Sequence, residues 1–393
     1  MASYYRPDEQ AISPPDFKVY ALSDSLLRLY VRINTEHLLF TRQPDQSFQA
    51  MFGVEVDILG SYDQPTLLDS FSFATPISYA DHDLYKVFSY ELPLHASGDL
   101  LARLTLADVN KGSSEIYYQR FNSSLVQGSN AFVAMNDNGV PAFNDYFTAA
   151  DTIKINFRDS AVHEVWCKYY QREFPLSAPP FTFDIRTSFD YTPDSVFKIS
   201  VNDTNTVTFS TTGFYWLQED TTLLQGWTAF CFDQGYPNVV TTAQMVAPLR
   251  YLTSRAEYAQ LDTAASSRKA VDAFWLERSS GNRERAKLLI KKYYNRVQFA
   301  NRLFSCHTQG WRTDRGMIYV VFGAPNIIYR YTNSETWIYG SENSPTALNF
   351  LFVKVDNPFT VNDYSLTRSP IYESPWYRGI DFWRQGRAYN SIY

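Results

Sequence analysis

The sequence has few cysteines, few methionines and no long hydrophobic run. Among 393 residues there are 3 cysteines and 5 methionines. No uninterrupted apolar stretch approaches the roughly 18 residues of a membrane span, so no membrane-spanning helix is expected. Charged residues make up only 19% of the chain and hydrophobic residues 45%, which excludes an intrinsically disordered protein. The net charge of −6 lacks the basic footprint of a general nucleic-acid binder, so we expect no nucleic-acid partner.

The chain as given also lacks a recognisable export signal at its start. The first residues, MASYYRPDEQAISPP, contain no basic cluster followed by an apolar segment. Either the protein is cytoplasmic or a leader has been removed.

The odd number of cysteines allows at most one disulfide. Cys167 and Cys231 lie in phase with apolar residues of two predicted strands, at the separation typical of facing sheets in an immunoglobulin-like domain. These two residues therefore form either a disulfide or a pair of buried free thiols. Cys306 precedes His307, but adjacent residues on a helix point about 100° apart, so we expect no reactive pair there.

The sequence lacks the common motifs of catalysis and metal binding. No G-x-S-x-G elbow, H-E-x-x-H helix or phosphate-binding loop occurs, and none of the 5 histidines pairs with another at zinc-binding spacing. We therefore predict no enzymatic activity, no catalytic residue, no metal ligand and no cofactor. A glycoside hydrolase remains a third alternative because Asp314 and Glu335 could serve as its two carboxylates, although any acidic protein offers such pairs.

Aromatic residues are abundant, at 17% of the chain, and favour β-structure. Apolar and polar residues alternate along segments such as 27–33, 48–58 and 100–106, which indicates half-buried strands. A second β-rich block follows, with strands expected at 153–157, 181–185 and 197–201. This pattern predicts two tandem immunoglobulin-like β-sandwiches. The expected organisation is an extended segment at 1–16, sandwiches at 17–125 and 126–248, and a further domain at 249–393.

The last domain changes from strand to helix periodicity. Apolar residues recur at helical spacing between residues 283 and 304, and a shorter helix is expected at 267–279, ended by Gly281 and followed by Asn282 as a cap. Strands are expected at 317–322, 335–339 and 348–355. The fold class is therefore mainly β, with a C-terminal α+β domain in which a long amphipathic helix packs on a small antiparallel sheet.

Two surface features of this domain are candidates for partner binding. The polar side of the long helix is basic, and it either docks a partner or is simply solvated. Its candidate docking residues are Arg283, Lys287, Lys291 and Arg296. The tail is rich in aromatic residues, which either stack on glycans or anchor a segment that wraps the domain. The candidate stacking residues are Trp376, Tyr377 and Trp383.

The most distinctive stretch is a short run that follows the long helix. It consists of Gly310, Trp311, Arg312, Thr313, Asp314, Arg315 and Gly316. Thr313 and Asp314 can bond to nearby backbone N–H groups, and Gly316 permits a tight turn that begins the strand at 317–322. We interpret the run as a structural corner, with a catalytic site as the alternative.

The residues Gly310, Trp311, Thr313 and Asp314 spell the G-W-x-T-D signature. With the continuation DRGMIYVVFGAPNIIYR and the segment ETWIYG, the region 255–390 resembles the GWxTD domain of cell-envelope proteins from Bacteroidota and some other bacteria. The resemblance implies an exported protein, often a lipoprotein, without an established enzymatic activity. It implies a location in the periplasm or at the outer membrane of a Gram-negative bacterium, with membrane association only through a lipid anchor that this chain does not contain.

These observations lead to one main hypothesis and two alternatives. The main hypothesis is a non-enzymatic structural or interaction protein, a subunit or scaffold of an outer-membrane-associated assembly, whose partners are other envelope proteins. The first alternative is a carbohydrate-binding surface protein that uses exposed aromatic side chains. The second is the hydrolase described above.

Overall fold

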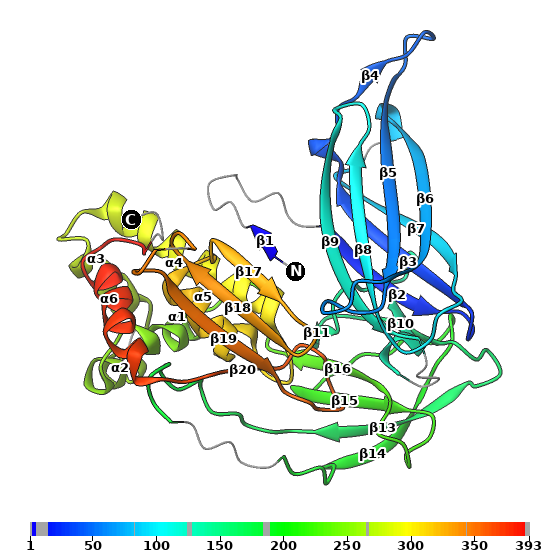
Figure 1. Cartoon of the computed structure of the whole chain (residues 1–393). Helices are drawn as coiled ribbons and strands as arrows, with labels where there is room; N and C mark the ends of the chain where they lie inside the picture. The colour runs from blue at the N-terminus through cyan, green and yellow to red at the C-terminus, as the bar shows by residue number, and fades with distance from the viewer. Residues whose placement is uncertain are drawn as a thin grey trace.

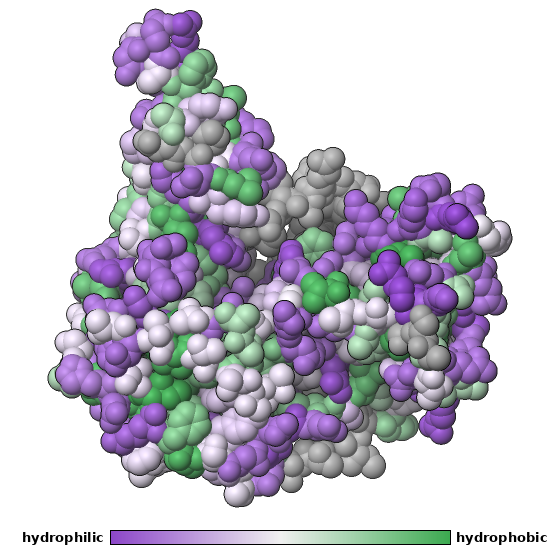
Figure 2. Space-filling model, turned by 180° about the vertical axis from the view of Figure 1, so that it is seen from behind, coloured by the Kyte–Doolittle hydropathy of each residue, from purple (hydrophilic) through white to green (hydrophobic). Residues whose placement is uncertain are grey.

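The computed structural model describes residues 2–4, 15–81, 83–123, 128–183, 189–264, 267–342 and 344–389. A mostly β N-terminal region with several antiparallel sheets is followed by a mixed region of helices and a small antiparallel sheet (Figure 1). The first β region stands as an arm on a broader base formed by the rest of the chain, which is also visible from behind (Figure 2). The predicted domain limit between residues 125 and 126 lies outside the described residues.

The first β region consists of two sheets that share one core. One sheet contains β2 (Asp16–Ala21), β3 (Leu26–Asn34) and β7 (Tyr85–Pro93). The other contains β4 (Thr41–Arg42), β5 (Phe48–Leu59), β6 (Leu67–Ser78), β8 (Asp99–Asp108) and β9 (Ser113–Asn122). Val54, Val56 and Ile58 are at most 1% exposed while Glu55 faces solvent, so the predicted alternation is confirmed in the middle of β5. It fails at Phe48, which is 48% exposed, and at Asp57, which is buried and pairs with Arg103.

The second β region is built in a similar way from shorter strands. A two-stranded sheet pairs β10 (Phe132–Met135) with β12 (Lys154–Phe157). A five-stranded sheet has the order β11 (Tyr146–Thr148), β16 (Trp227–Phe232), β15 (Gly213–Gln218), β13 (Glu164–Tyr170) and β14 (Ser195–Ser200), and only its β11–β16 pair is parallel. Inward residues of both sheets form one hydrophobic cluster.

One predicted strand of this region is wrong. Phe181 and Phe183 belong to no strand, and Phe183 is 89% exposed, while Ile185 lies outside the described residues. The prolines at 175, 179 and 180 explain the error, because proline cannot donate a hydrogen bond to a sheet.

The predicted helices of the C-terminal region are confirmed. They are α3 (Ser267–Arg278) and α4 (Arg283–Phe304), accompanied by α1 (Thr242–Val246), α2 (Arg255–Asp262), α5 (Asp314–Phe322) and α6 (Glu373–Arg384). Asn282 caps α4 by accepting a hydrogen bond from the Arg285 N–H, and Gly281 takes a φ of 78° between α3 and α4. Within the described ranges, none of these helices has the length and hydrophobicity needed to cross a membrane.

These helices pack on a five-stranded antiparallel sheet. Its order is β1 (Ala2–Tyr4), β17 (Ile327–Arg330), β18 (Ser334–Tyr339), β19 (Leu348–Lys354) and β20 (Tyr364–Leu366). The strands predicted at 335–339 and 348–355 are confirmed. The sequence did not indicate that β1, from the other end of the chain, would pair with β17.

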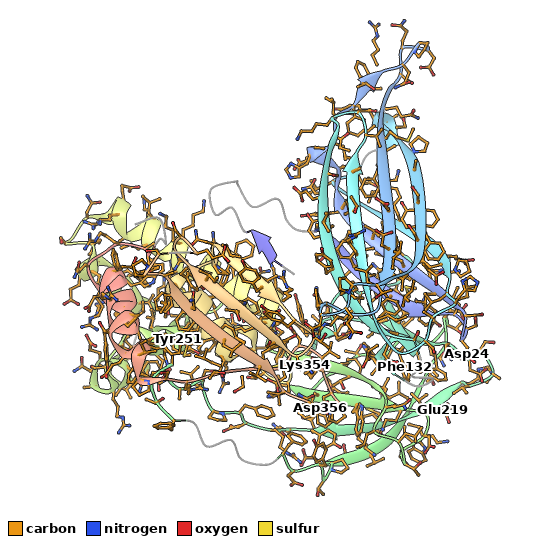
Figure 3. All side chains as sticks on the ribbon, in the orientation of Figure 1. Asp24, Phe132, Glu219, Tyr251, Lys354 and Asp356 are labelled. Carbon is orange, nitrogen blue, oxygen red and sulfur yellow. The ribbon has the colours of Figure 1, made fainter. Side chains whose placement is uncertain are left out.

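Ion pairs join the two β regions at the foot of the arm. Lys18 of β2 contacts Asp145 beside β11 at 2.6 Å, and Asp24 in the β2–β3 turn pairs with Arg158. Figure 3 places Asp24 and Phe132 at this foot, and Lys354 and Asp356 where the C-terminal sheet meets the second β region.

The acidic side chain of Glu257 ties α2 to the C-terminal helix α6. Arg384 donates to both of its oxygens at 2.9 Å, and this interaction lowers the pKa of Glu257 to about 2. A depressed carboxyl pKa contributes stability above the pKa of the unfolded chain, and this contribution disappears as the pH falls toward the folded value.

We therefore expect Glu257→Gln to be less stable than the wild-type protein, by a margin that is full above about pH 5 and shrinks toward pH 2. Urea unfolding midpoints of both proteins, measured at steps across this range, test the expectation. A stability difference that is the same at pH 6 and pH 3 would show that the charge of Glu257 does not stabilise the fold.

Candidate functional site

The signature residues form a close crossing of backbone between α4 and α5. They lie on a short 3-10 turn, Gly310–Arg312, and on the start of α5. A Cβ atom added to Gly310 would lie 2.0 Å from the carbonyl oxygen of Ala300, and one added to Gly316 would lie 1.9 Å from that of Gly310. Both glycines are required because only glycine lets two backbones approach so closely.

Thr313 begins α5 as its N-cap. Its hydroxyl accepts a hydrogen bond from the Gly316 N–H at 3.0 Å and donates to the Gly310 carbonyl at 2.8 Å. The strand predicted at 317–322 is therefore wrong, and a helix takes its place. Every residue of the run MIYVVF is buried, and a uniformly apolar run shows no period that separates a buried helix from a strand.

Trp311 is fixed by hydrogen bonds at three points. Its backbone N–H donates to the Asn301 side chain at 3.1 Å, and its indole N–H donates to Gln309 at 2.7 Å. Its carbonyl accepts from the buried hydroxyl of Tyr251 at 3.0 Å. The Tyr236 hydroxyl accepts from the neighbouring Gly310 N–H at 3.1 Å, so residues well before the signature complete this corner.

Asp314 forms a buried ion pair with Arg368. The guanidinium donates to both carboxylate oxygens, at 2.7 and 3.1 Å, and the side chains are only 4% and 7% exposed. Asp314 also accepts from the backbone N–H of Leu366 in β20, at 2.8 Å. The carboxylate therefore joins α5 to the edge of the sheet, rather than bonding only to its own turn as the sequence suggested.

Arg315 makes a second buried connection. Its guanidinium lies 3.5 Å from Glu335 and 4.0 Å from the ring centre of Tyr364, and it donates to the Asn362 carbonyl at 2.8 Å. Glu335 also accepts from the indole of Trp337 at 3.1 Å. Both carboxylates of the hydrolase alternative are thus buried and paired with arginine side chains of the fold.

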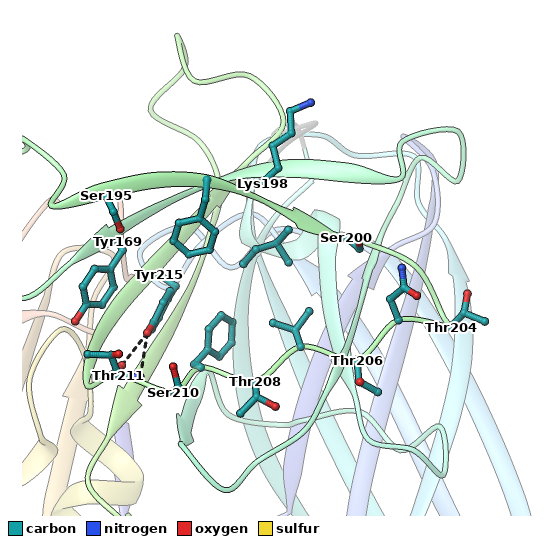
Figure 4. A pocket seen from close by; sticks show the side chains of 15 residues that line it. Tyr169, Ser195, Lys198, Ser200, Thr204, Thr206, Thr208, Ser210, Thr211 and Tyr215 are labelled. Carbon is teal, nitrogen blue, oxygen red and sulfur yellow. Dashed lines mark hydrogen bonds between the residues drawn. The ribbon is translucent and has the colours of Figure 1, made fainter.

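An open groove lies elsewhere, at the edge strand β14. Its volume is about 830 Å³, and its walls are β14 and the extended segment 204–211 (Figure 4). Hydroxyl side chains line it, together with Tyr169 and Tyr215 (Figure 4). In the described part of the chain β14 pairs only with β13, so its other edge has unpaired backbone groups.

Phe197 shows that the core of the second β region is not fully covered at the groove. It lies opposite Cys167 in the ladder and shares its face, and Cys167 is fully buried. Phe197 nevertheless remains 39% exposed. The facing layer, which buries Ile199 and Phe209 nearby, stops short of this side chain.

Comparison with known protein families identifies the C-terminal part of the chain. The family model of the GWxTD domain matches residues 213–385. The chain contains a GWxTD domain. The match begins at β15, before the predicted limit at residue 249, and so it includes the Tyr236 that supports the signature. A search of curated proteins found no match.

Three of the four residues of the predicted docking face are exposed, and the docking itself stays a prediction. Arg283, Lys287 and Lys291 are exposed on α4, and Lys287 pairs with Glu284 at 2.8 Å. Arg296 instead points into the domain, where it donates to the Val321 carbonyl at 3.0 Å. Burial lowers the pKa of this guanidinium to about 10. Arg296 is therefore removed from the docking face.

The glycan-stacking prediction fails for two of its three residues. Trp376 and Trp383 lie on the inner side of α6 and are 3% and 0% exposed. The Trp383 indole donates to the Val321 carbonyl at 2.9 Å. Only Tyr377 is exposed, and its ring packs beside Phe181. The tail forms a helix whose large aromatic residues anchor it, which was the alternative interpretation.

The proposed disulfide is absent, and the alternative of two buried free thiols holds. Cys167 and Cys231 are free and lie in the same sheet rather than in facing sheets. Their strands, β13 and β16, are separated by β15. Cys167 pairs with Leu217 of β15 whereas Cys231 pairs with Gly213. Two strand spacings of about 4.8 Å already exceed the reach of a disulfide.

Proposed function

We propose that the chain is a non-enzymatic structural or interaction protein of the bacterial cell envelope, a subunit or scaffold of an outer-membrane-associated assembly. In this proposal the two β regions are immunoglobulin-like spacers, and a partner protein binds at the β14 groove. The resemblance of the C-terminal region to GWxTD domains of envelope proteins supports the location.

The observation that carries the docking proposal is the groove beside an unpaired strand edge. An extended peptide can add to such an edge through backbone hydrogen bonds, and its side chains enter pockets along the strand. The fitting occupant is an extended segment of the partner with an apolar residue that covers Phe197. The hydroxyl groups along the groove can satisfy its neighbouring polar atoms.

The condition of the signature residues supports a non-catalytic role. Gly310, Trp311, Asp314, Arg315 and Gly316 are all buried, and the polar side chains among them bond to other parts of the fold. A catalytic group must reach its substrate. Buried side chains whose hydrogen bonds go to other parts of the fold are better suited to holding α5 against the sheet and α4.

Photo-crosslinking from β14 tests the docking proposal. A photoreactive amino acid is placed at position 197 or at position 196 of the full chain, in the native cells. Val196 is the matched control, because it is 49% exposed on the same strand but points to the opposite face. We expect one discrete crosslinked protein from position 197 and at least about tenfold less from position 196.

The variants Phe197→Asp and Val196→Asp provide a second readout. Only the first should reduce recovery of that crosslinked protein with the tagged chain, while both melt within a few degrees of wild type because both sites are partly exposed. Equal crosslinking from both positions, or a glycan in place of a polypeptide in the adduct, would contradict the proposal.

A further inference from the structure

Cys306, His307 and Asp363 meet just beyond the end of α4. The sulfur, an imidazole nitrogen and a carboxylate oxygen lie within 4.8 Å of one another, with 3.9 Å between Nδ1 of His307 and Oδ2 of Asp363. The sequence argument against Cys306 and His307 assumed that both were helical. Because α4 ends at Phe304, the 100° separation does not apply, and Asp363 joins them from the loop between β19 and β20.

The surroundings of the sulfur suit a thiolate bound to a cation. Burial and then the charge of Asp363 raise the pKa of the Cys306 thiol to about 12, whereas hydrogen bonds from the backbone N–H groups of Thr308 and His307 lower it. A bound divalent cation would cancel the two unfavourable influences and retain the favourable one.

We propose that Cys306, His307 and Asp363 bind one Zn²⁺ ion. Sulfur, nitrogen and carboxylate oxygen are the three ligand types that zinc uses in proteins, whereas Ca²⁺ and Mg²⁺ require oxygen ligands. In a zinc tetrahedron of ordinary bond lengths the ligand atoms lie roughly 3.3 to 3.8 Å apart. The 3.9 Å between Nδ1 of His307 and Oδ2 of Asp363 is just above this range, and no two of the three ligand atoms are more than 4.8 Å apart. Side-chain rotations would bring the three atoms onto one ion, and water or a partner's side chain would take the fourth position.

Neighbouring groups support the ligands and leave a route for the ion. The Asn357 side chain donates to Oδ2 of Asp363 at 3.1 Å, as expected of a residue that orients a metal ligand. A cavity of about 590 Å³ is lined in part by Ser305, Asn357 and Asn362, next to the proposed ligands. The His307 and Asp363 side chains are 21% and 13% exposed, so the site is open on one side.

Binding includes a defined proton release. The S–H bond of Cys306 breaks, an S–Zn bond forms, and the proton goes to solvent, with no change of oxidation state. Zinc affinity should therefore rise with pH. The ion would join the segment after α4 to the β19–β20 loop, which also holds Arg315 through Asn362.

The test uses the full chain after removal of metals with a chelator. ZnCl₂ is titrated against a chromophoric competitor, and Co²⁺ is added separately as a spectroscopic probe. We expect one zinc per chain, a rise in melting temperature with zinc, and a thiolate-to-cobalt charge-transfer band. A wild-type chain that binds no zinc at micromolar concentration would overturn the proposal.

Variants assign the site. His307→Ala and Asp363→Asn should lose the one-to-one binding, and Asn357→Ala should weaken it by about 10-fold to 100-fold. His95→Ala is the matched control, because His95 lies far away in the first β region beside Asp69, and this variant should bind like wild type. Circular dichroism checks that each variant is folded. Unchanged binding by folded His307→Ala and Asp363→Asn would overturn the assignment even if zinc binds the chain.

Discussion

Replacing Gly316 by alanine is expected to prevent stable folding of the GWxTD domain. The new Cβ atom would lie 1.9 Å from the carbonyl oxygen of Gly310, and the clash is with backbone rather than with a movable side chain. Relief requires α5 to move away from the 3-10 turn, which would break the N-cap made by Thr313. The expected loss exceeds about 4 kcal/mol, at the extreme of single substitutions.

Gly53→Ala is the matched control for this experiment. A Cβ atom at Gly53, in the middle of β5, would meet only side-chain atoms at 3.4 Å or more and a carbonyl at 3.8 Å. This variant should be as stable as wild type or slightly more stable, since glycine weakens strands. Thermal unfolding followed by circular dichroism compares the two. A Gly316→Ala protein that melts within a few degrees of wild type would refute the close-crossing explanation.

Asp314→Asn should be the second most damaging change, although it preserves the shape of the side chain. It removes the charge of Asp314 from its buried pair with the guanidinium of Arg368. Breaking a buried ion pair from one side costs about 3 to 5 kcal/mol, which corresponds to a fall of about 10 °C or more in melting temperature. The asparagine oxygen can still accept from the Leu366 N–H, so the loss reports the missing charge.

The surface pair between Arg28 and Glu91 provides the comparison. Its atoms lie at a similar distance, 2.6 Å, but the side chains are 33% and 55% exposed. Glu91→Gln should therefore cost less than about 1 kcal/mol. Urea unfolding of both variants measures the contrast. Similar small losses for the two would mean that the buried pair does not hold α5 to the sheet.

Regular features of the fold were predictable because they repeat along the chain. The alternation in β5 reports which face is buried, and the apolar stripe of α4 with its Asn282 cap reports a helix, so both elements follow from local patterns. The period disappears where every residue is buried, as in α5. The sequence of such a segment is compatible with a strand and with a helix, and tertiary packing determines which of the two forms.

Contacts between distant segments could not be predicted from one sequence. Nothing near Asp314 points to Arg368, and nothing near Gly316 shows that a backbone carbonyl lies against it. The same limit applies to Cys167 and Cys231, because alternation indicates that both are buried but not that β15 lies between them. For Cys306 and His307, the position where α4 ends decided whether they could act together.

The open groove illustrates a different limit. Sequence patterns identify β14 as a strand but do not show that its outer edge is unpaired. That depends on where the neighbouring segment 204–211 lies, which the sequence does not show. Phe197 resembles any inward-facing core residue in the sequence. Its 39% exposure becomes meaningful only once the facing layer is known to end beside it.

The central claim is that the signature residues stabilise the fold while the β14 groove binds the partner. Its most direct test is a double variant that combines Asp314→Asn with Arg368→Gln. The double variant removes both charges, so it should lose less stability than the two single changes added together. The measurement is the yield of the crosslinked protein from position 197, at a temperature where the double variant is folded. The account predicts the wild-type yield, whereas a folded double variant that forms no crosslink would show that the signature itself binds the partner.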